Sequence, residues 1–135
     1  MRIAPPEAPK SGYLYGKGVY FADLFAKSAP YCRAYTSDNT ALLLLCQVAL
    51  GNPAELTSCD SNIDDKVKKS KGKWDSCFAK GNQMPDPKQN VKKGDYVVPN
   101  GKVTNITSGG WGYNEYIVYN TNQVKMKYLV KVKLN

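Results

Sequence analysis

The feature that most constrains the fold is a single apolar run in the first half of the chain. Residues 41–50 are almost all apolar, and the turn-forming sequence Gly51-Asn52-Pro53 ends the run. The run is far shorter than the roughly 20 apolar residues that a membrane-spanning helix needs. Its length, its composition and the turn after it are instead typical of a strand buried on both faces.

Two later segments also predict strands. Residues 114–119 are dense in β-branched and aromatic side chains. Over residues 128–134 apolar side chains at even positions alternate with lysines at 131 and 133, which is the period of a half-buried strand. Asp23 and the apolar residues up to Tyr31 indicate a modest helix, capped by Asp23 and distorted by Pro30. We therefore predict an α+β fold dominated by β-sheets, in one domain over residues 1–135.

Positive charge gathers in the middle of the chain. The formal net charge is +8, and residues 66–93 alone hold nine lysines and two acidic residues. This window is rich in Gly, Pro, Asn and Ser and has no apolar period, which predicts a long solvated lysine-rich loop over residues 58–94. Loops of this length usually have a task. The loop could simply aid solubility, contact a polyanion by neutralising phosphates, or carry a nuclear import signal at residues 66–73.

The absence of histidine excludes much chemistry. With no imidazole, this chain alone cannot build Ser-His-Asp or Cys-His catalysis or most zinc sites. Its four cysteines form no Cys-x-x-Cys pair, so we expect no metal site. The N-terminal residues lack the apolar stretch of a secretory signal, so we expect reduced thiols, an intracellular protein and no membrane partner.

Two groups of motifs resemble one enzyme family. The first comprises Arg-Ile-Ala-Pro-Pro-Glu-Ala-Pro at 2–9, Gly-Lys-Gly-Val-Tyr-Phe-Ala-Asp at 16–23, Lys-Ser-Ala at 27–29 and Tyr-Cys at 31–32. The second comprises Tyr-Asn-Glu-Tyr-Ile-Val-Tyr at 113–119, Gln-Val at 123–124 and the closing strand. Together they closely resemble the C-terminal part of the catalytic domain of the poly(ADP-ribose) polymerases, of the diphtheria-toxin-like ADP-ribosyltransferase class. The resemblance covers nearly the whole chain.

The resemblance implies a fold, a reaction and partners. The fold would be the ADP-ribosyltransferase fold, with mixed and antiparallel sheets, few helices and a donor loop at residues 2–17. The reaction would transfer ADP-ribose from NAD+ to a protein side chain or to a growing poly(ADP-ribose) chain, with release of nicotinamide. NAD+ and acceptor proteins would be the partners, with poly(ADP-ribose) as another acceptor and nucleic acid bound through other domains of a longer protein. The family also implies a nuclear location.

The resemblance further implies which residues bind nicotinamide and stabilise the reacting sugar. Tyr20 and Tyr31 match the family's stacking tyrosines, and two aromatic faces suit a flat cationic ring. Ser28 matches the serine that binds the carboxamide. Glu115 matches the catalytic glutamate, and a fixed anion there would stabilise the positive charge that builds on the ribose.

Four further residues have roles implied by the same motifs. Lys27 corresponds to a lysine beside the acceptor end of the pocket, and we group it with Glu115 as catalytic. Tyr113 corresponds to an aromatic on the acceptor side. Ala22 belongs to the NAD+ side, and Arg2 matches a nucleotide-contacting arginine, for which a guanidinium offers several donors.

One member of the family's His-Tyr-Glu signature is missing. The signature histidine lies before the donor loop, and this chain begins inside that loop, so we expect a fold incomplete at its N-terminus. Absent strands would leave apolar faces uncovered and favour association. This polypeptide alone is then expected to be weakly active or inactive. The alternative function is an inactive module that binds NAD+, poly(ADP-ribose) or nucleic acid.

Overall fold

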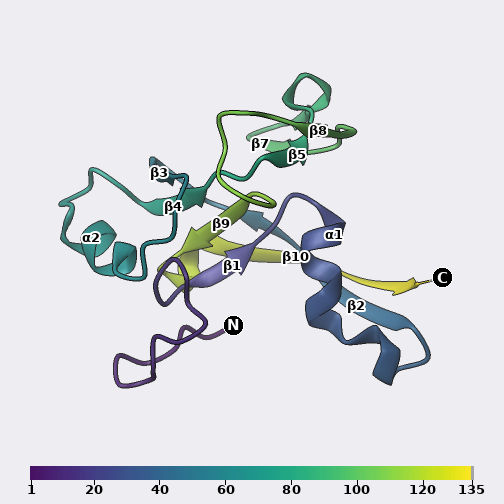
Figure 1. Cartoon of the computed structure of the whole chain (residues 1–135), viewed down its shortest axis with the longest axis horizontal. Coiled ribbons are helices and arrows are strands. Elements are labelled where there is room, and N and C mark those ends of the chain that lie inside the picture. The colour runs from purple at the N-terminus through teal and green to yellow at the C-terminus, as the bar shows by residue number, and fades with distance from the viewer. Residues whose placement is uncertain (135) are drawn as a thin grey trace.

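The structure, a computed structural model, describes residues 1–134 and has the α+β fold that the sequence predicts (Figure 1). The strands are β1 (Val19–Phe21), β2 (Thr40–Val48), β3 (Pro53–Leu56), β4 (Ser76–Ala79), β5 (Gln83–Pro85), β6 (Val91–Lys93), β7 (Tyr96–Val98), β8 (Val103–Asn105), β9 (Glu115–Val118) and β10 (Val124–Lys133). The α-helices are α1 (Phe25–Ser28) and α2 (Ile63–Lys69), and 3-10 helices span Ala29–Cys32, Ala34–Thr36, Pro87–Gln89 and Thr121–Gln123. No helix within residues 1–134 is long and apolar enough to cross a membrane.

A mixed four-stranded sheet forms the body of the molecule. Its strand order is β1-β9-β4-β3, with β9 antiparallel to both of its neighbours and β4 parallel to β3. Ile117 and Val118 of β9 are fully buried, because this strand is paired on both sides. Ile63 and Val67 of α2, one helical turn apart, pack into the same core cluster as Ile117. The predicted strand at 114–119 is therefore confirmed as an interior strand.

A long two-stranded ribbon extends beside this body (Figure 1). β2 pairs antiparallel with β10, from Val48 opposite Val124 to Thr40 opposite Lys133. The prediction that residues 41–50 form a strand is correct, but the prediction that both faces are buried is wrong. Leu42, Leu44 and Leu45 are 58%, 52% and 56% exposed, since β2 has a single strand neighbour in its sheet.

The C-terminal strand is likewise more exposed than its alternation predicts. Tyr128 and Leu129 of β10 are 63% and 67% exposed, although they belong to opposite faces of the strand. The ribbon thus shows apolar side chains on both faces within the described residues.

The predicted helix after Asp23 is shorter than expected and is not capped by Asp23. α1 has four residues and continues as the 3-10 helix Ala29–Cys32, which carries Pro30 near its start. Leu24 occupies the N-cap position without a side-chain hydrogen bond. The Asp23 carboxylate instead accepts hydrogen bonds from Asn114 and Tyr116 of the sheet. The expected distortion at Pro30 is confirmed, because the helix changes type there.

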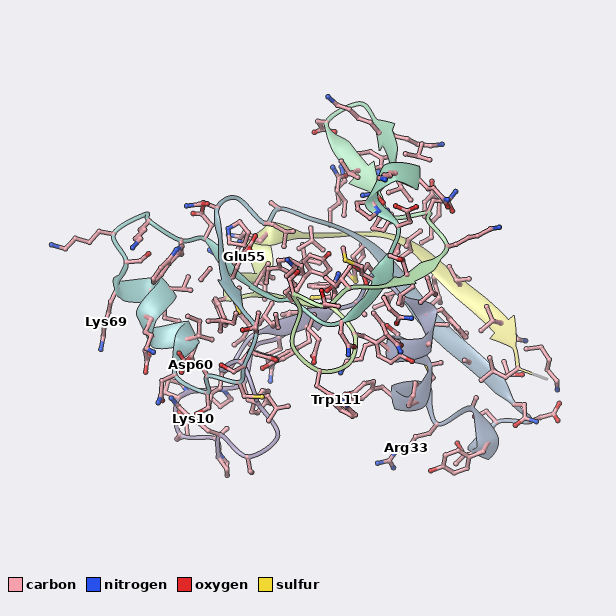
Figure 2. All side chains as sticks on the ribbon, turned by 45° about the horizontal axis from the view of Figure 1, so that its top comes forward. Lys10, Arg33, Glu55, Asp60, Lys69 and Trp111 are labelled. Atoms are coloured by element: carbon pink, nitrogen blue, oxygen red, sulfur yellow. The ribbon has the colours of Figure 1, made fainter. Side chains whose placement is uncertain are left out.

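The lysine-rich segment is not the featureless loop that we predicted. Residues 58–94 contain α2, β4, β5, β6 and the 3-10 helix Pro87–Gln89, and β4 is an interior strand of the body. Eight of the nine lysines are nevertheless exposed, with Lys80 half-buried. Figure 2 shows Lys69 extending from α2 away from the body. These elements are three to seven residues long, too short for their apolar periods to stand out in the sequence.

Candidate active site

One cavity, of about 410 Å³, lies where the N-terminal loop, β1, α1 and the start of β9 meet. It is lined by Gly12, Tyr13, Leu14, Tyr20, Phe21, Ala22, Lys27, Ser28, Tyr31 and Glu115. β1 and β9 are neighbours in the sheet, and α1 follows β1 directly, so residues from both halves of the chain converge. Six of the eight predicted site residues therefore line the same cavity.

Tyr20 is held rigidly on one side of the cavity. Its hydroxyl donates a hydrogen bond to the carbonyl oxygen of Gly16, at 2.7 Å, and accepts one from the backbone N–H of Tyr15, at 3.0 Å. Burial is the main reason that the pKa of Tyr20 is raised to about 12. The phenol is thus neutral near pH 7, and its ring is fixed by two hydrogen bonds made with the N-terminal loop.

Tyr31 contributes a second aromatic ring, which is largely exposed to solvent, unlike the ring of Tyr20. It lies on the 3-10 helix after α1 and is 77% exposed. The ammonium of Lys27 lies 6.0 Å from the centroid of its ring. The cavity thus combines one fixed aromatic wall with one solvent-exposed aromatic wall. Ser28 lines the cavity at the end of α1, and Ala22 lines it just after β1.

Glu115 and Lys27 form the charged end of the cavity. The Lys27 ammonium lies 2.9 Å from Glu115 Oε1, and the two side chains are 25% and 16% exposed. Burial acts to lower the pKa of Lys27, but the hydrogen bond and charge of Glu115 outweigh it and raise that pKa above its ordinary value. The pair places a carboxylate at the first residue of β9, facing the cavity.

A buried network behind Glu115 escaped the sequence analysis. Asn114 is fully buried; its side-chain oxygen accepts from the N–H of Gly81 at 2.9 Å, and its amide donates to Asp23 at 2.8 Å. The Tyr116 hydroxyl donates to the same carboxylate oxygen at 2.9 Å. Burial raises the pKa of Asp23, against the opposing effect of both hydrogen bonds. The only signal for this network was that Asp23, Asn114 and Tyr116 each flank a predicted site residue in the sequence.

Gly81 allows this network to form. A Cβ on Gly81 would lie 2.6 Å from the carbonyl oxygen of Tyr113, so only glycine permits the close backbone approach. The approach brings the N–H of Gly81 to Asn114, next to Glu115.

Two predicted site residues lie outside the lining of the cavity. Arg2 is exposed near the N-terminus, and Tyr113 is half-buried and bridges to Gln83 through the backbone. No group of three or more His, Cys, Asp or Glu side chains within residues 1–134 is placed to hold a metal ion. The four cysteines are free thiols.

Comparison with known sequences supplies the remaining evidence. Residues 1–134 match the family described as "Poly(ADP-ribose) polymerase catalytic domain". The chain belongs to this family. The resemblance found in the motifs is thereby confirmed, and it extends over all the residues that the structure describes.

Several poly(ADP-ribose) polymerases are similar to the chain. It is 50% identical over 139 residues to poly(ADP-ribose) polymerase 2 of Arabidopsis thaliana, covering 100% of this chain and 21% of that protein. It is 48% identical over 137 residues to poly(ADP-ribose) polymerase 1 of Danio rerio, covering 100% of this chain and 13% of that protein. The Drosophila melanogaster poly(ADP-ribose) polymerase is 44% identical over 138 residues, or 98% of this chain and 13% of that protein. The chain thus spans about a fifth or less of the length of these relatives.

Proposed function

We propose that this chain supplies the nicotinamide-binding and catalytic part of an NAD+-dependent ADP-ribosyltransferase. The observation that carries the proposal is that Tyr20, Tyr31 and Glu115 line one cavity. Membership of the poly(ADP-ribose) polymerase family supports the same reaction class. In that reaction the bond between the nicotinamide nitrogen and ribose C1′ breaks, and its electron pair leaves with nicotinamide. An acceptor nucleophile then bonds to C1′ and loses its proton.

The two tyrosines suit the leaving group. Nicotinamide in NAD+ is a flat cation, and aromatic faces attract such rings by stacking and by cation–π interaction. Tyr20 offers a ring whose position is fixed before the ligand arrives, which lowers the ordering cost of binding. Tyr31, which is largely exposed, would close the other side of the ring. The Ser28 hydroxyl would bind the carboxamide.

Glu115 suits the reacting sugar. A carboxylate that accepts a hydrogen bond from a ribose hydroxyl stabilises the electron-poor sugar as nicotinamide departs. The same carboxylate would then receive the proton of the acceptor. Lys27 holds Glu115 in the free protein, and a ribose hydroxyl would exchange with the ammonium as a partner of the carboxylate. Lys27 would then be available to the acceptor side.

Acceptors, partners and location are further parts of the proposal. Protein side chains and poly(ADP-ribose) are the acceptors that the family implies, with Tyr113 on the acceptor side and Arg2 toward the nucleotide of NAD+. We propose a nuclear location, with nucleic acid bound through other parts of a longer protein. The family's His-Tyr-Glu signature has no histidine partner in this sequence, so this polypeptide alone is expected to turn over NAD+ slowly or not at all.

Binding and turnover test the proposal separately. In calorimetry with the 135-residue chain, Tyr20→Leu should weaken NAD+ binding about tenfold or more, whereas Tyr35→Leu, an exposed tyrosine outside the cavity lining, should leave it unchanged. In a longer protein that contains this chain, Glu115→Gln should lower ADP-ribose transfer by roughly 10²-fold to 10³-fold while NAD+ affinity changes less than about threefold. Equal transfer by wild type and Glu115→Gln would remove Glu115 from its role.

The alternative is a binding module without catalysis. The ion pair between Lys27 and Glu115 favours it, because the carboxylate already has a charged partner. Such a module would bind NAD+ or nicotinamide with the same dependence on Tyr20, but it would release no nicotinamide in any longer form of the protein. A polyanion bound through the exposed lysines would be recognised by a steep loss of affinity with salt.

A further inference from the structure

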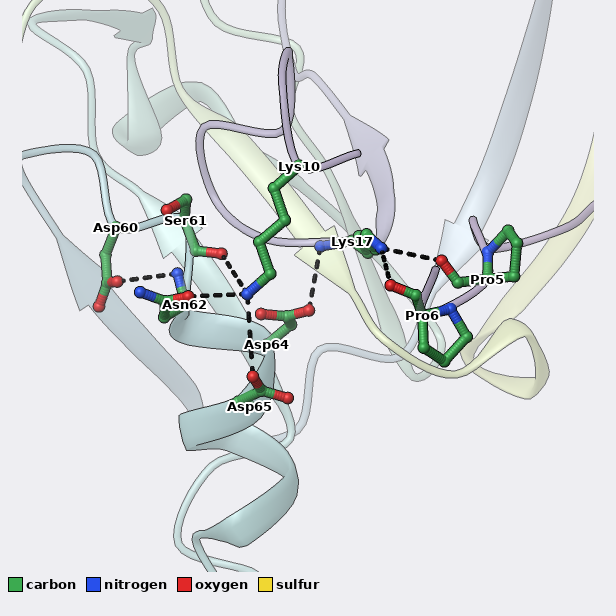
Figure 3. Close-up of polar contacts among 9 residues, drawn as sticks. All are labelled: Pro5, Pro6, Lys10, Lys17, Asp60, Ser61, Asn62, Asp64 and Asp65. Atoms are coloured by element: carbon green, nitrogen blue, oxygen red, sulfur yellow. Dashed lines mark hydrogen bonds and ion pairs between the residues drawn. The ribbon is translucent and has the colours of Figure 1, made fainter. Parts of the chain in front are cut away.

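Lys17 is an unusual lysine. It is 4% exposed and is the only buried lysine among residues 1–134. Its ammonium donates to the carbonyl oxygens of Pro5 and Pro6, at 2.8 and 2.5 Å (Figure 3). The ion pairs of the described residues do not include Lys17, so backbone carbonyls alone hold a buried charge. Burial of a charge is costly unless its donors are satisfied, and this charge closes a loop that starts 12 residues earlier.

Helix α2 anchors the same point of the chain. The backbone N–H of Lys17 donates to Asp64 Oδ2 at 3.2 Å, and Asp64 is 3% exposed. A Cβ on Gly16 would lie 2.7 Å from the Asp64 side chain, and Gly16 has a φ of 73°, so this contact depends on glycine. Residues 16 and 17 are therefore fixed on α2, and the Lys17 side chain extends from there to the prolines.

The loop that Lys17 closes forms a wall of the cavity. Gly12, Tyr13 and Leu14 lie within this loop and line the cavity. A second lysine, Lys10, ties the loop to the start of α2: its ammonium donates to Asn62 Oδ1 at 2.7 Å and to the carbonyl oxygen of Ser61 at 3.4 Å, and it lies 3.8 Å from Asp65 Oδ2 (Figure 3). The Lys10 side chain is, however, 40% exposed. The loop is thus held by one buried lysine and one partly exposed lysine.

We propose that Lys17 is a positioning residue that holds the loop of residues 5–17 in place as a wall of the NAD+ cavity, with Asp64 of α2 as its anchor. The proposal rests on the proposed function for the identity of the ligand, but not for the state of the loop. It makes α2, at the head of the lysine-rich segment, a determinant of NAD+ affinity although none of its residues lines the cavity.

Hydrogen exchange tests the state of the loop without any need for activity. The amides of Ala8, Tyr13 and Gly16 donate within the loop and report on its order, and those of β9 report on the whole fold. In the 135-residue chain, Lys17→Met should speed exchange of the loop amides about tenfold or more while β9 is unchanged. The matched variant Lys10→Met, which removes the more exposed polar contacts of the same loop, should speed it less than about threefold.

Calorimetry with NAD+ then tests the consequence. Lys17→Met should raise the Kd for NAD+ about tenfold, and Lys10→Met should leave it within about threefold. Loop exchange equal to wild type in Lys17→Met would overturn the proposal, and so would faster exchange with an unchanged Kd. If wild type binds no NAD+, the proposed function fails, while loop exchange still decides whether Lys17 orders the loop.

A pair of variants at Asp64 covers the case in which Lys17→Met unfolds the chain. Asp64→Asn keeps an oxygen that can accept from the N–H of Lys17, and loop exchange should stay within about threefold of wild type. Asp64→Leu removes that acceptor and should speed loop exchange about tenfold. Equal loop exchange in the two variants would overturn the proposal.

Discussion

The central sheet and the β2–β10 ribbon are built from similar residues but differ in what surrounds them. Both are rich in branched aliphatic and aromatic side chains. In the sheet, Ile117 of β9 is completely buried between β1 and β4 and under α2. In the ribbon, Leu44 of β2 and Leu129 of β10 face each other across the pair and are 52% and 67% exposed.

The difference teaches that burial here follows from the number of neighbouring elements and not from the apolar character of a strand. In β9, which is paired on both sides, Ile117 and Val118 are completely buried. In the two-stranded ribbon, Leu42, Leu44 and Leu45 of β2 keep about half of their surface exposed. None of the cavity residues belongs to the ribbon: they lie in the N-terminal loop, in or just after β1, in α1 and the 3-10 helix that follows it, and at the start of β9, so the candidate site does not depend on the exposed strands.

The largest expected effect comes from shortening a fully buried side chain of the sheet. Ile117→Ala should lower the free energy of unfolding by about 2–5 kcal/mol, because the buried site cannot collapse around the lost methyl groups. Leu44→Ala in the ribbon should cost less than about 1 kcal/mol, since that side chain is half in water already. Urea unfolding of both variants measures the difference. Similar losses would mean that the ribbon is as tightly packed as the sheet.

A smaller effect should come from the network behind Glu115. Asn114→Ala leaves the N–H of Gly81 without its side-chain acceptor and leaves the Asp23 carboxylate with Tyr116 as its one side-chain donor, and this should cost about 1–3 kcal/mol. The control, Asn105→Ala, removes an exposed side chain on β8 and should change stability by less than about 0.5 kcal/mol. Urea unfolding again provides the measurement. A neutral Asn114→Ala would show that Gly81 and Asp23 find other partners.

The next prediction concerns how stability depends on pH: Asp23, which is bonded to the sheet, should affect this dependence, and Asp38, at the end of the ribbon, should not. The folded-state pKa of Asp23 is raised from 3.8, mainly by burial, so the folded chain keeps this proton to higher pH than the unfolded chain does. The resulting stabilisation is fully present below pH 3.8 and is lost as pH rises through the folded-state pKa. Wild type should therefore lose stability relative to Asp23→Asn as pH rises across that window, and the difference should be flat above it.

The ribbon supplies the control for this pH experiment. Asp38 forms an ion pair with Lys133 at the end of the ribbon and is 92% exposed. An exposed pair contributes little to stability, so Asp38→Asn should follow wild type across the acid range. A similar pH dependence for the two substitutions would mean that the burial of Asp23 does not govern its titration.

The sequence predicted which residues gather at the cavity better than it predicted how deeply each strand is buried. Six predicted residues line one cavity because motif resemblance preserves the order and spacing of side chains that a fold brings together. The other two predicted residues, Arg2 and Tyr113, lie outside the cavity lining. The position of Arg2 depends on the path of the exposed first residues, and the position of Tyr113 depends on a backbone bridge to Gln83. No sequence motif reveals either feature. Lys17 lay inside a matching motif, but its burial depends on α2, a remote segment of the chain.

The errors in the fold share one physical cause. The apolar run at 41–50 shows that a strand forms, but a sequence pattern cannot count the elements that will cover it. Asp23 precedes a helix as a capping residue would, yet its carboxylate bonds to Asn114, some 90 residues later. The segment at 58–94 lacks a clear period because α2 and β4 are short; β4 is stabilised by pairing inside the sheet, and α2 by packing in the same core cluster. Tertiary contacts decided each of these cases.

The smallest expected effect on stability is the most informative about the ribbon. Leu44→Lys and Leu129→Lys each place a charge where the side chain is more than half exposed, so each should change the free energy of unfolding by less than about 0.5 kcal/mol. The same substitutions should reduce self-association, which exposed apolar faces on a two-stranded ribbon promote. Sedimentation over a range of concentrations measures this, with Lys131→Glu on the same strand as a control that leaves the apolar surface intact. If both leucine substitutions cost as much as Ile117→Ala, other molecules bury these leucines in solution. The difference in burial between the sheet and the ribbon would then hold only for the chain taken by itself.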